Sequence, residues 1–167
     1  MTTLMTNQCI AFFDEGSSNT VPVAMFSDFA CPICRVKYDR LTHLAANDPN
    51  TFHIVRHQLP LLGLTSAVAS RAVLAAELQS QYRAMRARLI RTPAVTDERF
   101  ITAIAENLDL DADRLLPDMQ SNAIDRRLRL TAAFAVVFGF IGTPAFAVGL
   151  MVLMGSIQIG SLRKLIA

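Results

Sequence analysis

The feature of this 167-residue sequence that most constrains its fold is a pair of cysteines, Cys31 and Cys34, at the junction of two different patterns. The apolar run over residues 21–26 is typical of a buried β-strand, and residues 35–46 carry apolar side chains at helical spacing. The sequence therefore predicts that a helix begins at the cysteines, directly after a strand. Unpaired N–H groups and the helix dipole at that N-terminus stabilise an anion, so they favour the thiolate form of Cys31.

Two cysteines at this spacing form a dithiol that can close and reopen. Cys34 lies one helical turn after Cys31, close enough to attack a mixed disulfide formed there, and Pro32 suits an early helical position because its missing N–H costs nothing. The chain has one further cysteine, Cys9, so the count fits one working pair rather than a disulfide-stapled scaffold. We expect Cys9 to be a small buried hydrophobe, with a third redox centre as the alternative.

The rest of the chain alternates between strand and helix patterns. We expect strands at residues 8–13, 21–28, 51–58, 145–148 and 151–154, and a Gly149-Leu150 hairpin joins the last two. We expect helices at residues 35–46, 66–91 and 157–166. Three more helices are expected to begin at N-cap residues: one at Thr96 that ends at 107, one at Asp109 or Asp111, and one at Ser121.

Without the block of helices between the third and fourth strands, this order is that of a thioredoxin-like α/β sandwich. The predicted fold class is therefore α/β, thioredoxin-like with an inserted helical domain. Residues 1–62 and 139–167 are expected to form the thioredoxin-like domain with the active site, and residues 63–138 the inserted domain.

Composition and charge exclude two classes of partner. Hydrophobic residues make up 52% of the chain, but its longest apolar stretch, residues 131–154, is interrupted by Gly139, Gly142 and Gly149. No uninterrupted run reaches the roughly 18 residues of a membrane span, so we expect no stable span. The net charge of +2, with no basic tract interleaved with aromatics, indicates no binding of nucleic acid.

Three separated motifs, in this order, resemble the DsbA family of thiol-disulfide oxidoreductases, with the middle one similar to its ScsC-like branch. The motifs are residues 26–34 (FSDFACPIC), residues 59–63 (LPLLG) followed by Ser66, Ala69 and Ala72, and residues 139–146 (GFIGTPAF). A CxxC motif alone is a moderate signal for this family. CPxC followed, after a helical insertion, by the tripeptide Gly-Thr-Pro is a strong one. The resemblance covers about residues 21–166.

The resemblance implies a role for each residue that matches a family motif. Cys31 matches the nucleophile and Cys34 the resolving cysteine. Thr143 and Pro144 match a cis peptide that lies against the dithiol and leaves backbone groups free to pair with a substrate strand. Pro32, with its neighbour Ile33, is expected to contact the substrate as well.

The implied enzyme is a protein thiol-disulfide oxidoreductase, a disulfide oxidase or isomerase. Its partners would be cysteine-containing protein substrates and a redox partner that resets the dithiol, and it would need no cofactor and no metal. Since Ile33 stands where a histidine can help to stabilise the thiolate, we expect a milder oxidant than the most oxidising members. The family works in the periplasm, so we expect a periplasmic protein whose leader is absent from residues 1–8, with the cytoplasm as the alternative.

Other interpretations of these residues stay open at this point. Asp28 could relay a proton to Cys34 through water, or its carboxylate could simply satisfy N–H groups. The cysteines could hold a soft metal such as Cu(I) in a binding module on a thioredoxin scaffold, or zinc with Cys9 and His53 or His57. Relatives of the DsbA fold that act as glutathione transferases or isomerases do not need Cys34, whose presence argues against that activity. We expect His43 to be solvated, with a catalytic role for any of the histidines as the alternative.

Overall fold

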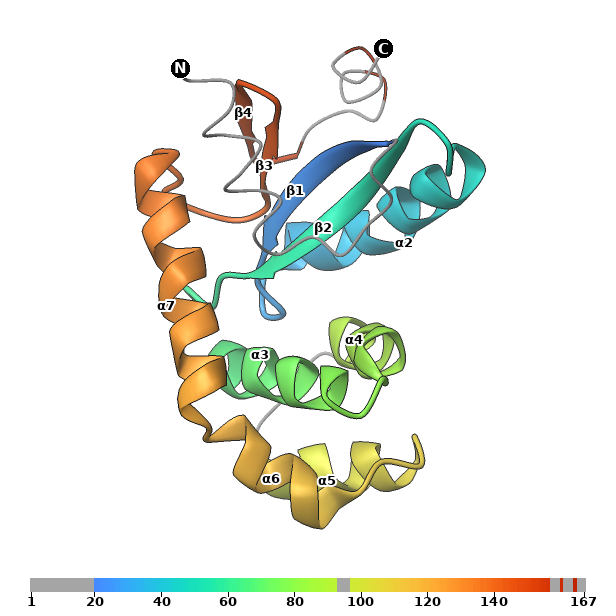
Figure 1. Ribbon diagram of the computed structural model, residues 1–167, viewed down its shortest axis with the longest axis vertical. Helices are drawn as coiled ribbons and strands as arrows, with labels where there is room; N and C mark the ends of the chain where they lie inside the picture. Colours follow the sequence, from blue (N-terminus) through green and yellow to red (C-terminus); the bar gives the residue numbers. More distant parts are fainter. Residues whose placement is uncertain (1–19, 93–96, 157–159, 161–163, 165–167) are drawn as a thin grey trace.

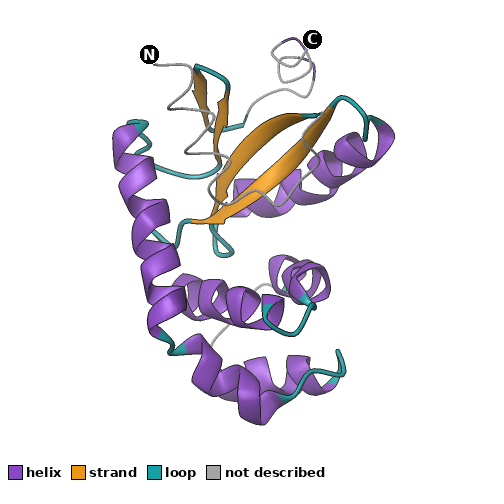
Figure 2. Cartoon of the chain, viewed as in Figure 1, coloured by secondary structure: helices purple, strands orange, loops and turns teal. Residues whose placement is uncertain are grey.

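The structure is a computed structural model that describes residues 20–92, 97–156, 160 and 164 (Figure 1). Its elements are, in chain order, β1 (Val21–Ser27), α2 (Pro32–Asn47), β2 (Phe52–Gln58), α3 (Leu64–Glu77), α4 (Tyr82–Arg91), α5 (Glu98–Glu106), α6 (Ala112–Met119), α7 (Asn122–Val137), β3 (Ala145–Val148) and β4 (Met151–Met154). In chain order, strands come before and after a block of helices, and Figure 2 shows the strands gathered together with most of these helices below them. This confirms the predicted thioredoxin-like α/β fold with a helical insertion.

The four described strands form one mixed sheet in the order β2-β1-β3-β4. β1 pairs in parallel with β2 and antiparallel with β3, and β3 pairs antiparallel with β4. A parallel pair needs a crossover connection, which α2 supplies. Since β1 is a central strand with neighbours on both sides and helices over both faces, its residues read as one continuous apolar run rather than an alternating pattern.

Helices cover the two faces of this sheet. On one face, Leu41 and Leu44 of α2 pack with Val23 and Met25 of β1 and with Phe146 of β3. On the other face, Ala135 of α7 packs with the small side chains of β1 and β3 and with the ring of Phe26. This two-sided cover fixes β1, and therefore the dithiol at its end, inside the molecule.

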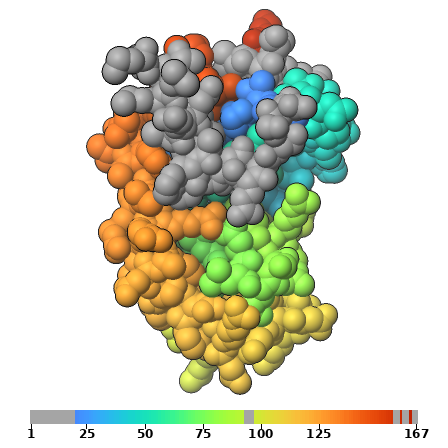
Figure 3. All heavy atoms as spheres, viewed as in Figure 1, coloured from blue at the N-terminus to red at the C-terminus, as the bar shows by residue number. Residues whose placement is uncertain are grey.

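The helices α3 to α6 enclose a core of their own, with Ile124 at the start of α7 contributing to it. In Figure 3 the atoms of these helices lie in the lower half of the face shown, together with part of α7. Phe29, which lies between β1 and the dithiol, is 2% exposed and belongs to this helical core. Burial of such a ring stabilises a fold by about 1.5–3 kcal/mol. Phe29 therefore ties the active-site segment to the helices, and the division into two domains at residues 63 and 138 stays a prediction.

Two details of the predicted helices are wrong. The single helix expected at residues 66–91 is two helices, α3 and α4, because Ser80 takes a left-handed conformation (φ 61°) and the N–H of Gln81 bonds back to the carbonyl of Ala76. The segment has no Gly or Pro, which are the usual sequence signals for such a break. The N-cap of α5 is Asp97, whose carboxylate accepts from the Phe100 N–H at 3.0 Å, and not the expected Thr96.

Other local predictions are confirmed. Asp111 and Ser121 cap α6 and α7 by accepting backbone N–H groups. Gly149, with a φ of 55°, opens the two-residue hairpin between β3 and β4. The expected strand at residues 8–13 and the residue Cys9 lie outside the described residues, as does the helix at 157–166 apart from two isolated positions. Among the described helices, none has the length and apolar character to cross a membrane.

Candidate active site

The dithiol lies at the N-terminus of α2. Cys31 is the N-cap residue of this helix, with Pro32 at its first position. The Cys31 Sγ accepts a hydrogen bond from the backbone N–H of Cys34 at 3.3 Å. A sulfur in this position interacts with the positive end of the helix dipole and with an otherwise unpaired N–H group, and both interactions favour an anion.

The loop that precedes β3 lies against the dithiol. The Thr143–Pro144 peptide bond is cis, and the thiol of Cys31 donates to the Thr143 carbonyl oxygen at 3.2 Å. The sheet register explains this proximity, because Phe26 near the end of β1 pairs with Ala145 at the start of β3. Antiparallel pairing therefore places the loop before β3 beside the turn that follows β1.

The second thiol has a different environment. Cys34 is 1% exposed, and burial raises the pKa of its thiol from 9.0 to about 12. Hydrogen bonds from the Asp28 backbone and the Thr143 side chain act in the opposite direction and lower this pKa, whereas interaction with Cys31 raises it. Both cysteines are free thiols in the structure. At neutral pH, Cys34 therefore holds its proton.

The Asp28 carboxylate, in a residue that is 1% exposed, is surrounded by hydrogen-bond donors. One oxygen accepts from the Ala30 N–H at 2.7 Å and the Ser66 hydroxyl at 2.5 Å, and the other accepts from the N–H groups of Leu61 and Leu62 at 2.7 and 2.9 Å. The carboxylate thus joins the active-site turn to the loop after β2 and to α3. This arrangement favours a positioning role, and the proton relay to Cys34 stays a prediction.

Sequence reasoning missed a buried arginine behind the active-site turn. Arg86 of α4 is 2% exposed, donates to the Ser27 hydroxyl at 2.9 Å and to Gln58 Oε1 at 3.0 Å, and lies over the Phe29 ring at 5.2 Å. The helical spacing of the sequence could have indicated this burial, because position 86 shares a helical face with the apolar residues Met85 and Leu89. A basic side chain on such a face indicates a buried polar contact.

The three histidines take separate places. His43 is exposed on α2, the His53 ring is hydrogen-bonded to the Thr20 hydroxyl at 2.7 Å, and His57 is buried with its ring stacked on Phe26 at 4.7 Å. Within the described part of the chain, no group of three or more His, Cys, Asp or Glu residues is arranged to hold a metal ion.

A dithiol at the start of a helix, opposite a cis-proline loop on a sheet of this order, is the arrangement of thioredoxin-like thiol-disulfide oxidoreductases. Comparison with family models supports this class: the model described as DSBA-like thioredoxin domain matches residues 22–167. The chain belongs to this family and is an oxidoreductase, as the sequence predicted. No curated protein sequence matches the chain.

Several solved structures share the fold. A thioredoxin-like oxidoreductase from Silicibacter pomeroyi DSS-3 is 32% identical with a TM-score of 0.81, over 87% of this chain and 83% of that one. The catalytic domain of Proteus mirabilis ScsC is 20% identical with a TM-score of 0.79, over 98% and 94% of the two chains. A periplasmic thioredoxin-like protein from Salmonella enterica serovar Typhimurium is 19% identical with a TM-score of 0.79, over 97% and 94%.

Proposed function

We propose that the protein exchanges disulfides with cysteine-containing proteins, as a disulfide oxidase or isomerase, with Cys31 as the nucleophile and Cys34 as the resolving cysteine. The observation that carries this proposal is the difference between the two sulfurs. The Cys31 Sγ accepts an N–H at the helix N-terminus, whereas Cys34 is buried and its pKa is raised to about 12. The first environment favours a thiolate that attacks, and the second holds a thiol in reserve.

In the reducing direction, the Cys31 thiolate attacks one sulfur of a substrate disulfide. A mixed disulfide forms, and the other substrate sulfur leaves as a thiolate. Cys34 then loses its proton, which passes to the departing sulfur or to water, and attacks the Cys31 sulfur. The second substrate thiolate leaves, and a Cys31–Cys34 disulfide remains. A redox partner must then reduce this disulfide to restore the dithiol. Donation of a disulfide to a substrate is the reverse sequence, and after it a redox partner must reoxidise the dithiol to the Cys31–Cys34 disulfide.

The surface around the dithiol suits an extended and partly apolar polypeptide. Pro32 is exposed, and Ile33 is 42% exposed. Leu61 and Ile141, in the loops beside Asp28 and Thr143, are 50% and 89% exposed. Unfolded chains present apolar side chains, and the backbone of Thr143 offers a pairing edge for such a strand. We therefore assign substrate contacts to Pro32, Ile33, Thr143 and Pro144.

We place this activity in the periplasm, where thiols are oxidised and disulfides persist. The periplasmic thioredoxin-like protein from Salmonella, with the same fold, supports this assignment. We assign the dithiol chemistry to the domain of residues 1–62 and 139–167. The helices of the inserted domain, residues 63–138, would form part of the surface around the dithiol.

The experiment is a redox titration of the Cys31–Cys34 pair in glutathione buffers, in a Cys9→Ser background. Alkylation and mass shift provide the readout, because the chain has no tryptophan. A potential between about −120 and −180 mV supports disulfide donation or shuffling, and one near about −270 mV, as in thioredoxin, indicates a reductase. A pair that never forms a disulfide contradicts the proposal, and one metal ion per reduced molecule would then indicate the copper-binding alternative.

A further inference from the structure

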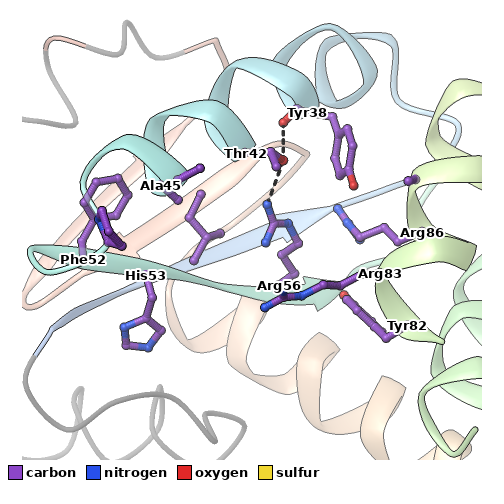
Figure 4. Close-up of a pocket in the computed structure, with 13 residues that line it drawn as sticks. Tyr38, Thr42, Ala45, Phe52, His53, Arg56, Tyr82, Arg83 and Arg86 are labelled. Carbon is purple, nitrogen blue, oxygen red and sulfur yellow. Dashed lines mark hydrogen bonds between the residues drawn. The ribbon is translucent and has the colours of Figure 1, made fainter. Parts of the chain in front are cut away.

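A pocket of about 630 Å³ opens between α2, β2 and α4 (Figure 4). Neither cysteine of the dithiol lines it. Three arginines, Arg56, Arg83 and Arg86, contribute to its wall, and none of the described residues that line it is Asp or Glu. The pocket therefore gathers positive charge without a carboxylate to balance it.

Arg56 makes only neutral contacts among the described residues. Its guanidinium donates to the Thr42 hydroxyl at 3.1 Å and lies over the Tyr38 ring at 5.9 Å. Its Nε is buried and has no hydrogen-bond partner within the part of the chain that the structure describes. Burial lowers the pKa of this guanidinium, and the neighbouring positive charge of Arg86 lowers it further. Each effect disfavours the charged form of the Arg56 guanidinium.

Arg86 is more deeply buried and equally short of negative charge. Its Nη1 and Nη2 groups donate to the neutral oxygens of Gln58 and Ser27, and its Nε is a second buried donor with no partner among the described residues. Its guanidinium lies 5.7 Å from the centre of the Tyr38 ring that Arg56 also covers. In Figure 4 the two guanidinium groups point into the same pocket.

Several arginines elsewhere in the described part of the chain lie against carboxylates. Arg71 lies against Asp125, Arg91 against Asp39 at 2.6 Å, and Arg127 against Glu77. Buried charges in proteins are normally paired, because an isolated ion in the interior is costly. In this pocket the buried Arg86 and the half-buried Arg56 have no carboxylate partner among the described residues, and an anion from outside would supply the missing charge.

We propose that this pocket binds an organic anion with a carboxylate or phosphate head group and a short apolar body. The head group would lie between Arg56, Arg83 and Arg86, since guanidinium forks bind planar and tetrahedral oxyanions through paired N–H donors. The apolar body would lie along Phe52 and Ile54, which also line the pocket. The volume is within the range of small-molecule sites.

The test is calorimetric titration of the full chain with hexanoate, with hexyl phosphate, and with hexanol as the uncharged probe. We expect saturable binding of at least one anion and none of hexanol, and the tighter anion identifies the head group as carboxylate or phosphate. Arg56→Gln and Arg83→Gln should each weaken that binding roughly tenfold, the loss of one charge-assisted hydrogen bond. Arg126→Gln is the matched control, because Arg126 is exposed on α7 and does not line the pocket.

Three results would overturn the proposal: no saturable binding of either anion at millimolar concentration, hexanol binding as well as the anions, or equal affinities for Arg56→Gln, Arg83→Gln and Arg126→Gln. The ligand should also raise the thermal midpoint of the wild-type chain more than that of Arg56→Gln. Arg83 is exposed, so its variant keeps the test decisive if loss of Arg56 perturbs folding.

Discussion

The thiol of Cys31 lies 3.2 Å from the carbonyl oxygen of Thr143, although 112 positions separate these residues in the sequence. The contact depends on the pairing of β1 with β3, which brings the dithiol turn and the cis-proline loop to the same end of the sheet. A substrate strand that pairs with Thr143 would therefore present its sulfur to Cys31.

The two cysteines should behave differently when a substrate is trapped. In a Cys9→Ser background, Cys34→Ser should accumulate a mixed disulfide with a cysteine-containing protein, because no second thiol can resolve it. Cys31→Ser should accumulate none, since burial raises the pKa of Cys34 to about 12 and its thiol keeps its proton at neutral pH. Non-reducing electrophoresis and mass spectrometry measure the adducts. An adduct on Cys34 of comparable yield in the Cys31→Ser variant would reverse the assigned roles.

Replacement of the Thr143 hydroxyl should slow the resolving step. The Thr143 side chain lowers the pKa of Cys34 by hydrogen bonding, so Thr143→Val should raise that pKa and reduce the thiolate available for attack. We expect the mixed disulfide to resolve about three to ten times more slowly, the effect of one neutral hydrogen bond. Stopped-flow mixing followed by acid quenching measures the rate.

Thr102→Val provides the control for this substitution, because the Thr102 hydroxyl donates to the Glu98 carbonyl within helix α5, in an exposed hydrogen bond. An equal rate for Thr143→Val and Thr102→Val would show that the hydroxyl at position 143 does not act on Cys34.

Asp28→Asn should destabilise the protein. The Asp28 carboxylate accepts four hydrogen bonds, two on each oxygen, and an amide would direct its NH₂ group at two of these donors. Buried donors without acceptors should lower the free energy of unfolding by about 2–3 kcal/mol. Urea unfolding measures the change, and Asp113→Asn, at an exposed position in α6, should alter stability little.

The same Asp28 variant tests the proton relay. If Asp28 only positions the turn, the rate of thiol exchange at Cys34 should stay unchanged under conditions where the variant is folded. A clear decrease in that rate, with no change for Asp113→Asn, would instead establish the relay.

The reduced protein should lose stability in alkaline solution. The pKa of Cys34 rises from 9.0 to about 12 on folding, so between these values the unfolded chain releases a proton that the folded chain keeps. Stability from this group is therefore complete below pH 9.0 and falls as pH increases toward 12. The expected slope is about 1.4 kcal/mol per pH unit.

Urea unfolding under reducing conditions, from about pH 8 upward, measures this dependence. Lysines and tyrosines also titrate in this range, so the informative quantity is the difference between the wild type and Cys34→Ala. Parallel pH profiles for the two proteins would contradict the raised pKa.

The sequence by itself determined the features that depend on neighbouring residues. The apolar run before Cys31 and the helical spacing after Cys34 placed the dithiol at a strand-to-helix junction, and Gly149 located the hairpin. Ser121 marked the start of α7. In each case the signal and the structure lie within one or two turns of chain, where backbone geometry and short-range hydrogen bonds decide the outcome.

The tertiary structure decided the features that depend on distant contacts. It buried Cys34 and so raised its pKa, gave the Asp28 carboxylate donors from three segments, and turned the chain at Ser80 without Gly or Pro. It also buried Arg86 beside Arg56, on a helix and a strand that are adjacent only in space. Burial and charge proximity are properties of packed segments, so no local pattern in the sequence contains them.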